Sequence, residues 1–467
     1  MQRLNNPLMM ISVIVSYLFL SAGLIGCDEQ EPQITSIQNS GLYAFVNVNV
    51  VPMDEERILE NQTVVVRDGR IVSVSAGDEA DIPDDAEQID GSGKYLMPGL
   101  AEMHGHIPGP DNRQYAKDVL FLYISNGVTT VRNMAGNAYH IELREWLNDN
   151  SIPGPTIFAA SPWLNPNTIP GPEDADRVVR ELQETGFDHM KMGNIPLETY
   201  RAVAETAHEI GLPFAGHIPE DVGLVNALEA RQKSIDHYDR YVEFLVPEDA
   251  GWDGSSPGFF GSAVVHLADE GRIPEAVDLT IEAGTWNVPT LTLVEHLASP
   301  EPAEEMAQWP EMRYLPSSVI EGWVESKHNF QARDDFQPEA ANRLVEIRRE
   351  LTRQLHDGGA LIVLGSDAPQ FFNVPGFSIH HEMEMMVAAG LTPYEVLVTG
   401  TRNAALYFDT PDEFGTVQEN RRADLILLSA NPLDDIANIR KREGVMVRGI
   451  WWPESAIQEE LSRIAAR

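Results

Sequence analysis

The most informative segment of the sequence is Met97-Pro98-Gly99-Leu100-Ala101-Glu102-Met103-His104-Gly105-His106-Ile107. A Pro-Gly turn leads into an apolar run, which predicts a buried strand. Because alternate residues of a strand point to the same face, we expect the side chains of His104 and His106 to face one point. Neutral imidazoles on a rigid strand supply part of a zinc-type site. A His-x-His pair also arises by chance, so this interpretation depends on the rest of the chain.

The length and charge of the chain limit its class. A chain of 467 residues suits one large barrel with a satellite domain. Its 72 acidic and 33 basic residues give a formal net charge of −39, which argues against nucleic acid, since affinity for nucleic acid comes from Lys and Arg contacts to phosphate. The acidic residues are scattered, which is typical of a solvated surface. We expect a small-molecule substrate and no nucleic-acid partner, and we leave a homo-oligomer open.

The N-terminal segment is typical of a targeting sequence. Residues 8–20 form an apolar run that is short for a membrane span, and Leu24-Ile25-Gly26-Cys27 follows it. Cys27 is the only cysteine, which excludes intramolecular disulfides and Cys-ligated zinc. The segment resembles the lipobox of bacterial lipoproteins, whose cysteine is acylated after cleavage.

The sequence therefore predicts a lipoprotein signal peptide over residues 1–27, a lipid anchor on Cys27 and a polar tether over residues 28–40. The anchor would attach the protein to a membrane of the cell envelope, on the periplasmic side. An ordinary signal peptide is the alternative, and it would lead to secretion of the chain.

Short strands separated by turns occur near both ends of the remaining chain. Near the start, β-branched runs at residues 63–66 and 71–74 enclose an Asp68-Gly69 turn, which predicts a hairpin. Near the end, residues 423–428 form a similar apolar run. Neither piece can bury a sheet alone, so we predict that they combine. The prediction is a small composite β-sandwich domain from residues 41–97 and 411–452, with a C-terminal helix over residues 453–467.

Between these pieces, apolar strands alternate with helical stretches, which is typical of βα units and a parallel sheet. Starting from the His104 strand, the alternation predicts an α/β fold, a (β/α)8 TIM-like barrel over residues 98–410. In such barrels, catalytic groups lie at the C-terminal ends of the strands. The further strands are predicted at residues 126–132, 155–160, 187–192, 212–217, 233–237, 288–291 and 361–367.

Potential metal ligands stand at the ends of these predicted strands: His104, His106, Lys191, His217, His237 and Asp367. Taken singly, each has a structural explanation. Lys191 is explained as an ion-paired lysine, His217 as a helix-cap partner and Asp367 as an N-cap. Their occurrence at the same level of one barrel favours a common site.

Several segments match the pattern of a known family. They are Met97-Pro98-Gly99-Leu100 before His-x-His, Gly127-Val128-Thr129-Thr130-Val131-Arg132, Ser234-Ile235-Asp236-His237, Gly365-Ser366-Asp367-Ala368, and Ala423-Asp424-Leu425-Ile426-Leu427-Leu428 with Asn431-Pro432-Leu433 after it. On these residues the chain resembles the amidohydrolase superfamily of metal-dependent hydrolases, in particular its prolidase-like and imidazolonepropionase-like branch. The resemblance runs from about residue 42 to about residue 452, and it is specific for the superfamily but not for a substrate.

The resemblance implies two divalent metal ions. His104, His106 and Asp367 would hold one, and His217 and His237 would hold the other. Lys191 would bridge them as a carbamate made with carbon dioxide, because a plain ammonium would repel two cations. Zinc suits this set, as do manganese, cobalt and iron. The ions would lower the pKa of a shared water toward about 7, and Asp367 would act as general base and then as general acid.

The reaction that the resemblance implies is hydrolysis of a carbon–nitrogen bond, as in a dipeptide or an N-acyl amino acid. The same superfamily also hydrolyses lactones, esters and phosphotriesters. Glu220, three residues after His217, resembles the general acid of mononuclear deaminases, which is a second alternative. A third is an envelope binding lipoprotein that has kept the barrel without the chemistry.

Two departures from the family pattern weaken the case for dipeptide specificity. Asn133 stands where relatives commonly have aspartate, and residues 163–167 replace a Gly-rich segment. The Gly-, Ser- and aromatic-rich residues 249–260 are either a lid or an exposed insertion. Candidate substrate contacts, with wall packing as the alternative for the tyrosines, are Tyr238, Tyr241, Arg132 and His381.

Overall fold

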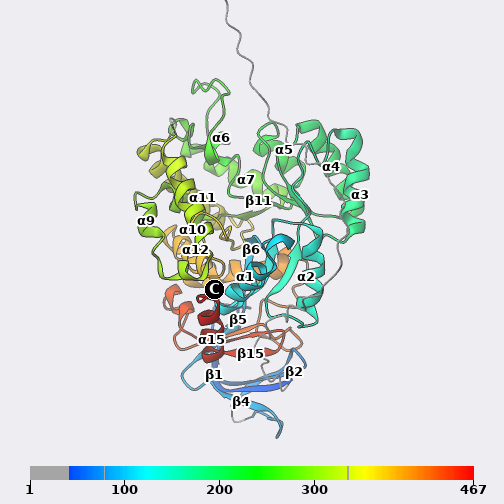
Figure 1. Cartoon of the computed structure of the whole chain (residues 1–467), viewed down its shortest axis with the longest axis vertical. Helices are drawn as coiled ribbons and strands as arrows, with labels where there is room; N and C mark the ends of the chain where they lie inside the picture. Colours follow the sequence, from blue (N-terminus) through cyan, green and yellow to red (C-terminus); the bar gives the residue numbers. More distant parts are fainter. Residues whose placement is uncertain (1–40, 78, 334–335) are drawn as a thin grey trace, which may run out of the picture. The chain divides into compact units, whose positions relative to one another are not determined.

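The computed structural model describes residues 41–77, 79–333 and 336–467. The predicted signal peptide, the lipidation site Cys27 and the tether therefore lie outside the described residues. Residues 39–467 belong to one unit, in which a mainly antiparallel sheet adjoins a region of alternating strands and helices (Figure 1). The helices of the described part are all too short or too polar to cross a membrane.

Strands from both ends of the sequence form one eight-stranded sheet. Its order is β15-β14-β13-β5-β1-β2-β3, with β4 paired to β1. The two parts of the chain meet where β13 runs antiparallel to β5, with Leu425 opposite Pro98. The strands are β1 (Leu42–Val50), β2 (Leu59–Arg67), β3 (Arg70–Ala76), β4 (Glu87–Asp90), β5 (Tyr95–Pro98), β13 (Leu425–Leu428), β14 (Arg442–Val447) and β15 (Ile450–Pro453).

Local sequence and long-range packing both shape this sheet. The β2–β3 hairpin turns at Asp68 and Gly69, whose φ angles of 49° and 78° suit the tight turns that match strand twist. Apolar residues from both chain ends then share one core, in which Phe45 packs edge-on against Trp451 at 5.3 Å between ring centroids. Each piece thus buries the apolar face of the other. The composite domain boundaries and the sandwich arrangement stay predictions.

A TIM-barrel-like α/β region follows, as predicted, and it is built from parallel strands. One sheet has the order β6-β7-β8 and another the order β12-β11-β10-β9. Parallel bridges between Ala160 and His189 and between Leu164 and Met192 connect the two. The strands are β6 (Leu100–Gly105), β7 (Val128–Asn133), β8 (Thr156–Ala159), β9 (Met190–Met192), β10 (Phe214–Gly216), β11 (Ser234–Asp236) and β12 (Trp286–Val288).

The strand predicted at residues 361–367 is an extended segment without regular strand pairing. Parallel bridges connect it to β12 through Asn287 and Ile362 and to the end of β6 through Gly105 and Ala368. The Met103 amide donates to the Leu364 carbonyl at 2.8 Å. The backbone of Asp367 turns left-handed, with φ of 65°, which ends the extended run. The segment still delivers Asp367 beside β6.

Helices surround these strands (Figure 1). Helix α4 (Leu197–Ile210), for example, is followed by a left-handed glycine, Gly211. The helices are α1 (Arg113–Ser125), α2 (Ala138–Asn148), α3 (Ala175–Thr185), α4 (Leu197–Ile210), α5 (Gly223–Glu229), α6 (Tyr241–Phe244), α7 (Ile273–Ala283), α8 (Leu291–Ala298), α9 (Ala303–Met306), α10 (Ser317–Gln331), α11 (Pro338–Gly358), α12 (Phe377–Ala388), α13 (Pro393–Gly400), α14 (Arg402–Tyr407) and α15 (Glu454–Ile464).

Candidate functional site

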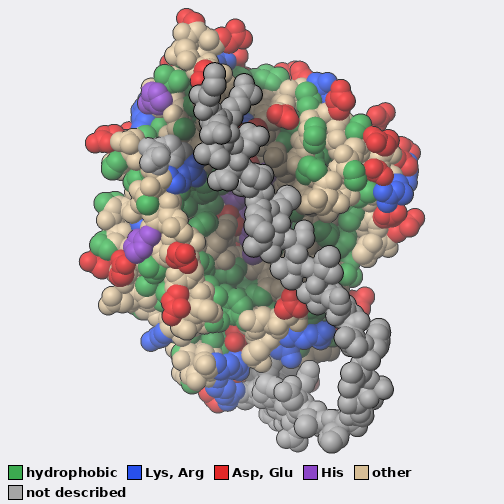
Figure 2. All heavy atoms as spheres, turned by 45° about the horizontal axis from the view of Figure 1, so that its top comes forward, with side chains coloured by type: hydrophobic (Ala, Val, Ile, Leu, Met, Phe, Trp, Pro, Cys, Tyr) green, Lys and Arg blue, Asp and Glu red, His purple; other side chains and the backbone are tan. Residues whose placement is uncertain are grey.

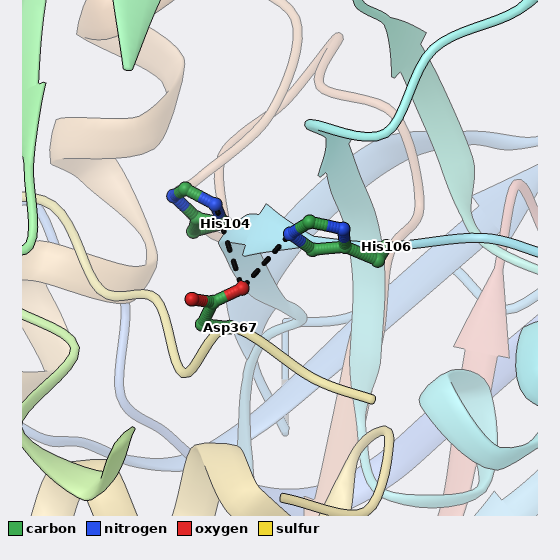
Figure 3. A group of neighbouring side chains, drawn as sticks. All are labelled: His104, His106 and Asp367. Carbon is green, nitrogen blue, oxygen red and sulfur yellow. Dashed lines mark ion pairs between the residues drawn. The ribbon is translucent and has the colours of Figure 1, made fainter. Parts of the chain in front are cut away.

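His104, His106 and Asp367 form a compact group at the end of β6 (Figure 3). Their potential ligand atoms all lie within 4.8 Å of one another. Nε2 of His106 lies 2.8 Å from Oδ1 of Asp367, and Nε2 of His104 lies 3.5 Å from the same oxygen. Despite this short distance, the buried His106 Nε2 and Asp367 Oδ1 atoms form no hydrogen bond with each other or with another group of the described residues. Converging unpartnered acceptors fit a bound cation.

The other predicted ligands lie around this group. Nζ of Lys191, on β9, is 3.1 Å from Nε2 of His104. The His237 ring is 4.5 Å from the His104 ring and 4.8 Å from the His217 ring, measured between centroids. Nδ1 of His237 is 3.6 Å from Oδ2 of Asp367. The structure therefore brings every residue of the predicted ligand set to one place.

Lys191 depends on a glycine in the neighbouring strand. Gly216, on β10, has a φ of 108°, and a Cβ atom built there would lie 2.9 Å from Cδ of Lys191. A larger residue would meet both backbone strain and the lysine stem. Gly216 thus leaves room for Lys191 to extend toward His104.

Aspartates lie behind two of the imidazoles, close to their Nδ1 atoms. His104 Nδ1 lies 2.7 Å from Oδ2 of Asp236, and His217 Nδ1 lies 2.8 Å from Oδ2 of Asp239. A carboxylate next to one ring nitrogen orients the ring and leaves the other nitrogen for a metal. This arrangement suits ligation through Nε2 at both positions.

The hydrogen-bond partner of His237 is a hydroxyl group. Nδ1 of His237 lies 2.8 Å from Oγ1 of Thr290, which follows β12. Sequence reasoning missed Thr290 and both aspartates as partners of the site. A signal existed for the aspartates, because Asp236 and Asp239 flank His237 in the sequence.

Burial sets the electrostatics of the site. His104, Lys191 and His237 have exposed fractions of 1%, 0% and 1%. Burial lowers the pKa of Lys191 to about 8, and it holds the pKa of His104 and His237 well below the usual range. Neutral imidazoles are the form that binds metals, and a neutral amine is the form that reacts with carbon dioxide.

A buried charge network lies beneath the ligands. The Arg132 guanidinium donates to Asp236 Oδ2 at 2.7 Å, to Ser234 Oγ at 2.8 Å and to the Met103 carbonyl. Its side chain is fully buried. The structure therefore favours a structural role for Arg132 over the substrate contact that the sequence predicted, because its hydrogen bonds fix Asp236 behind His104.

A second buried carboxylate connects β6 to the segment that carries Asp367. Glu102 accepts hydrogen bonds from the His104 amide and from the Ser366 amide, both at 2.9 Å. Burial raises its pKa to about 8. Glu102 thus ties the two backbone segments on which His104 and Asp367 lie.

A cavity of about 310 Å³ opens beside His217. Aromatic residues contribute to its walls, together with charged residues from the loops after β10 and β11. Glu220 lines this cavity and is exposed. The lining residues are Trp163, Gly193, Asn194, His217, Ile218, Pro219, Glu220, Asp239, Arg240, Glu243, Gly258, Phe259 and Phe260.

The model of the Amidohydrolase family matches residues 95–451, which include every ligand candidate described above. The chain belongs to the amidohydrolase family. It is accordingly an enzyme that hydrolyses carbon–nitrogen bonds in small molecules, and divalent metal ions are the cofactors typical of this family. The group of His104, His106 and Asp367 fits such an ion.

Individual relatives extend the comparison. The chain is 24% identical over 430 residues to the ochratoxinase of Aspergillus niger. The alignment covers 85% of this chain and 83% of that protein. A putative prolidase from Bifidobacterium longum has a similar structure, with a TM-score of 0.67, 24% identity, and coverage of 91% of this chain and 100% of that one. The bottromycin amidohydrolase has a TM-score of 0.68 at 21% identity, over 91% of this chain and 90% of that one. The structural likenesses establish the fold.

In this amidohydrolase the remaining predicted substrate contacts have other partners. Tyr238 Oη donates to Thr352 Oγ1 at 3.0 Å, and Tyr241 Oη lies 2.7 Å from Thr280 Oγ1. Both tyrosines are buried, which favours the wall packing considered as the alternative. His381 lines a different cavity, with its Nε2 3.6 Å from Oε1 of Glu311.

Proposed function

We propose that the protein is a binuclear metallohydrolase that cleaves the amide bond of a dipeptide-like or N-acyl amino acid substrate. The observation that carries the proposal is the gathering of the whole predicted ligand set, with Lys191 Nζ only 3.1 Å from His104 Nε2. His104, His106 and Asp367 would hold one divalent ion, and His217 and His237 would hold the second. Lys191 would join the two positions as a carbamate. Zinc suits these nitrogen and oxygen ligands, as do manganese, cobalt and iron.

The residues of the site have complementary roles in this proposal. When bound, the ions supply Lewis-acid activation of a water molecule and of the scissile carbonyl. The Asp367 carboxylate accepts the proton of the attacking water and later donates it to the leaving amine. Asp236 and Asp239 hold His104 and His217 in fixed orientations. The cavity beside His217 receives the substrate.

Glu220 supports a second candidate, a mononuclear deaminase, because it lines the same cavity as His217. In that case Glu220 would be the general acid, and Lys191 would stay an ordinary buried lysine. The proposal of a binuclear hydrolase is preferred because Lys191 lies among the ligands, whereas Glu220 lies at the exposed wall.

The deciding experiment measures metal content and amide hydrolysis together. The full chain is prepared with bicarbonate and zinc, and the variants Lys191→Ala and Glu220→Ala are compared with it. We expect about two metal ions per chain in the parent, loss of at least one in Lys191→Ala, and near-total loss of its activity. The Glu220→Ala variant should keep both its metal content and its activity.

The opposite pattern would reject the proposal. Full activity and unchanged metal content in Lys191→Ala would exclude the bridging carbamate. About one ion per chain, with activity lost in Glu220→Ala, would establish the deaminase. Hydrolysis confined to lactones, esters or phosphotriesters would agree with a metal pair, but it would mean that the bond cleaved is not an amide. If the parent binds no metal and hydrolyses no substrate, the remaining interpretation is a binding lipoprotein.

We also propose that the protein is anchored in the cell envelope through lipidated Cys27. The support is the Leu24-Ile25-Gly26-Cys27 segment alone. The test is incorporation of labelled palmitate into the full chain and into Cys27→Ser. Labelling of both, or of neither, would reject the anchor.

A further inference from the structure

Trp163 is exposed beside the site. Its exposed fraction of 49% is the highest among the large apolar side chains of the described residues. The indole ring meets the His217 ring edge-on, at 5.4 Å between centroids and 85° between planes, and it lines the cavity. Leaving this much aromatic surface in water is unfavourable. A ligand that covers the ring would recover that free energy.

The loop that carries Trp163 is fastened to the barrel. The Trp163 carbonyl accepts hydrogen bonds from Asn165 Nδ2 and Thr168 Oγ1, both at 3.1 Å. The next amide, that of Leu164, donates to the Lys191 carbonyl at 3.0 Å. Trp163 is thus positioned relative to β9 before any ligand arrives. Such preorganisation reduces the entropic cost of binding.

A second group of aromatic rings lines the same cavity. Phe260 lies 5.2 Å from the His237 ring and 4.3 Å from the Phe259 ring, measured between centroids. Trp163 therefore stands beside His217, and Phe260 stands beside His237. Phe259 and Phe260 end the segment at residues 249–260, for which the sequence predicted either a lid or an insertion.

Several charged residues of the cavity have partners within it, whereas Glu220 is exposed at its wall. Arg240 donates to Glu243 Oε1 at 2.6 Å and to the Ile218 carbonyl at 3.0 Å. Asp239 accepts from the Ile218 amide and lies against His217. Because these groups already have partners, the aromatic rings are the main apolar surface left for a ligand, beside the Glu220 carboxylate. That surface suits a flat, uncharged group.

We propose that this cavity binds an aromatic ring of the substrate, next to the scissile bond, so that aromatic amides are the substrate class. Trp163 and Phe260 would be the residues that determine this specificity. The inference rests on the proposed function, since it assigns a substrate class to the same site. It is independent of which metal the site holds.

The test compares amides that differ in their ring. The metal-loaded full chain is assayed with N-benzoylglycine, N-acetylphenylalanine and N-acetylglycine, all of which carry one carboxylate. We expect kcat/KM to be at least about tenfold higher for a ring-bearing amide, which corresponds to about 1.4 kcal/mol. Trp163→Ala should lower kcat/KM for that amide about tenfold more than it lowers kcat/KM for N-acetylglycine, mainly through KM.

Two variants serve as controls. Trp163→Phe keeps a ring and should restore most of the preference. Leu406→Ala removes another exposed apolar side chain, 41% exposed and on α14, and should leave kcat/KM unchanged for all three amides. Equal losses for all three amides in Trp163→Ala, or a parent enzyme without preference for the ring, would overturn the inference.

A binding measurement separates this inference from the hydrolase proposal. If the parent hydrolyses none of the amides, N-methylbenzamide and N-methylacetamide are titrated calorimetrically into the parent and into Trp163→Ala. Binding of N-methylbenzamide alone, lost in Trp163→Ala, would support the aromatic site while the hydrolase proposal fails. No binding of N-methylbenzamide to the parent would overturn the aromatic site itself.

Discussion

The histidines of the site differ in the group that lies next to the Nδ1 atom of each ring. His104 and His217 each face an aspartate through Nδ1, whereas His237 faces the hydroxyl of Thr290. A carboxylate raises the basicity of a ligating imidazole and fixes its ring more strongly than a hydroxyl does. The aspartates should therefore affect metal affinity although neither belongs to the predicted ligand set.

Asp239 offers a direct measurement of this effect. Replacing Asp239 with Ala removes the acceptor of His217 Nδ1 and of the Ile218 amide. We expect one metal position to weaken by about 10–100-fold, because the His217 ring loses its fixed orientation. Competition with a chromogenic chelator measures the affinity, and circular dichroism checks the fold. Unchanged affinity for both ions would show that Asp239 does not position His217.

Arg132 separates a structural role from substrate binding. Arg132→Met leaves the Asp236 carboxylate buried without its ionic partner. Removing one member of a buried pair costs about 3–5 kcal/mol, so we expect a decrease of that size in the free energy of unfolding. Denaturant titration of the metal-loaded chain measures it. A rise in KM with unchanged stability would instead support the substrate contact predicted from the sequence.

At the level of whole elements, α8 is held at both ends by side chains from other helices. At its start, Glu382 of α12 accepts from the Leu291 and Thr292 amides, both at 2.8 Å. At its end, Lys327 of α10 donates to the His296 carbonyl at 2.8 Å. Each side chain satisfies backbone groups that a helix end leaves unpaired. These contacts fix α8 directly after Thr290, the partner of His237.

Lys327 predicts a pH dependence of stability. Burial lowers its pKa from 10.5 to about 8, so the folded chain loses this proton first and the unfolded chain binds more protons between pH 8 and pH 10.5. Stability rises with pH wherever the unfolded state binds more protons. We expect the free energy of unfolding of the parent, relative to Lys327→Met, to rise by about 1–2 kcal/mol over this range.

Denaturant titrations of both chains at pH 8 and pH 10.5 provide the comparison for Lys327. The variant controls for every other group that titrates in this range. A parallel change in parent and variant would mean that Lys327 has an ordinary pKa in the folded state.

At the scale of the molecule, the charge of −39 is the dominant global property. Figure 2 shows acidic side chains spread over the visible face, with basic groups among them. Self-repulsion of a large net charge destabilises the compact state, and salt screens it, since the Debye length falls from about 10 Å at 0.1 M to about 3 Å at 1 M.

Salt should therefore stabilise the folded chain. Raising sodium chloride from 0.1 M to 1 M is expected to increase Tm by a few degrees, roughly in proportion to the repulsion removed. Differential scanning calorimetry measures the shift, with choline chloride at equal ionic strength as the control. A rise in Tm with sodium chloride but not with choline chloride would indicate specific cation binding instead of screening.

The sequence by itself determined the features that depend on local spacing. The His-x-His pair and the Asp68-Gly69 hairpin follow from short-range periodicity and turn chemistry, and family membership follows from motifs of this kind. The gathering of the ligand candidates was also predictable, because the C-terminal strand ends of a TIM-barrel-like fold lie at one level.

Only the tertiary structure decided what each side chain touches. Arg132 and Tyr238 stand next to site motifs in the sequence, yet their partners Asp236 and Thr352 come from other elements. The exposure of Trp163 beside His217 likewise depends on two loops that are distant in the sequence. The reason is physical. Periodicity places a side chain on a face, but burial, ion pairing and cavity walls arise from segments that meet only when the chain has folded.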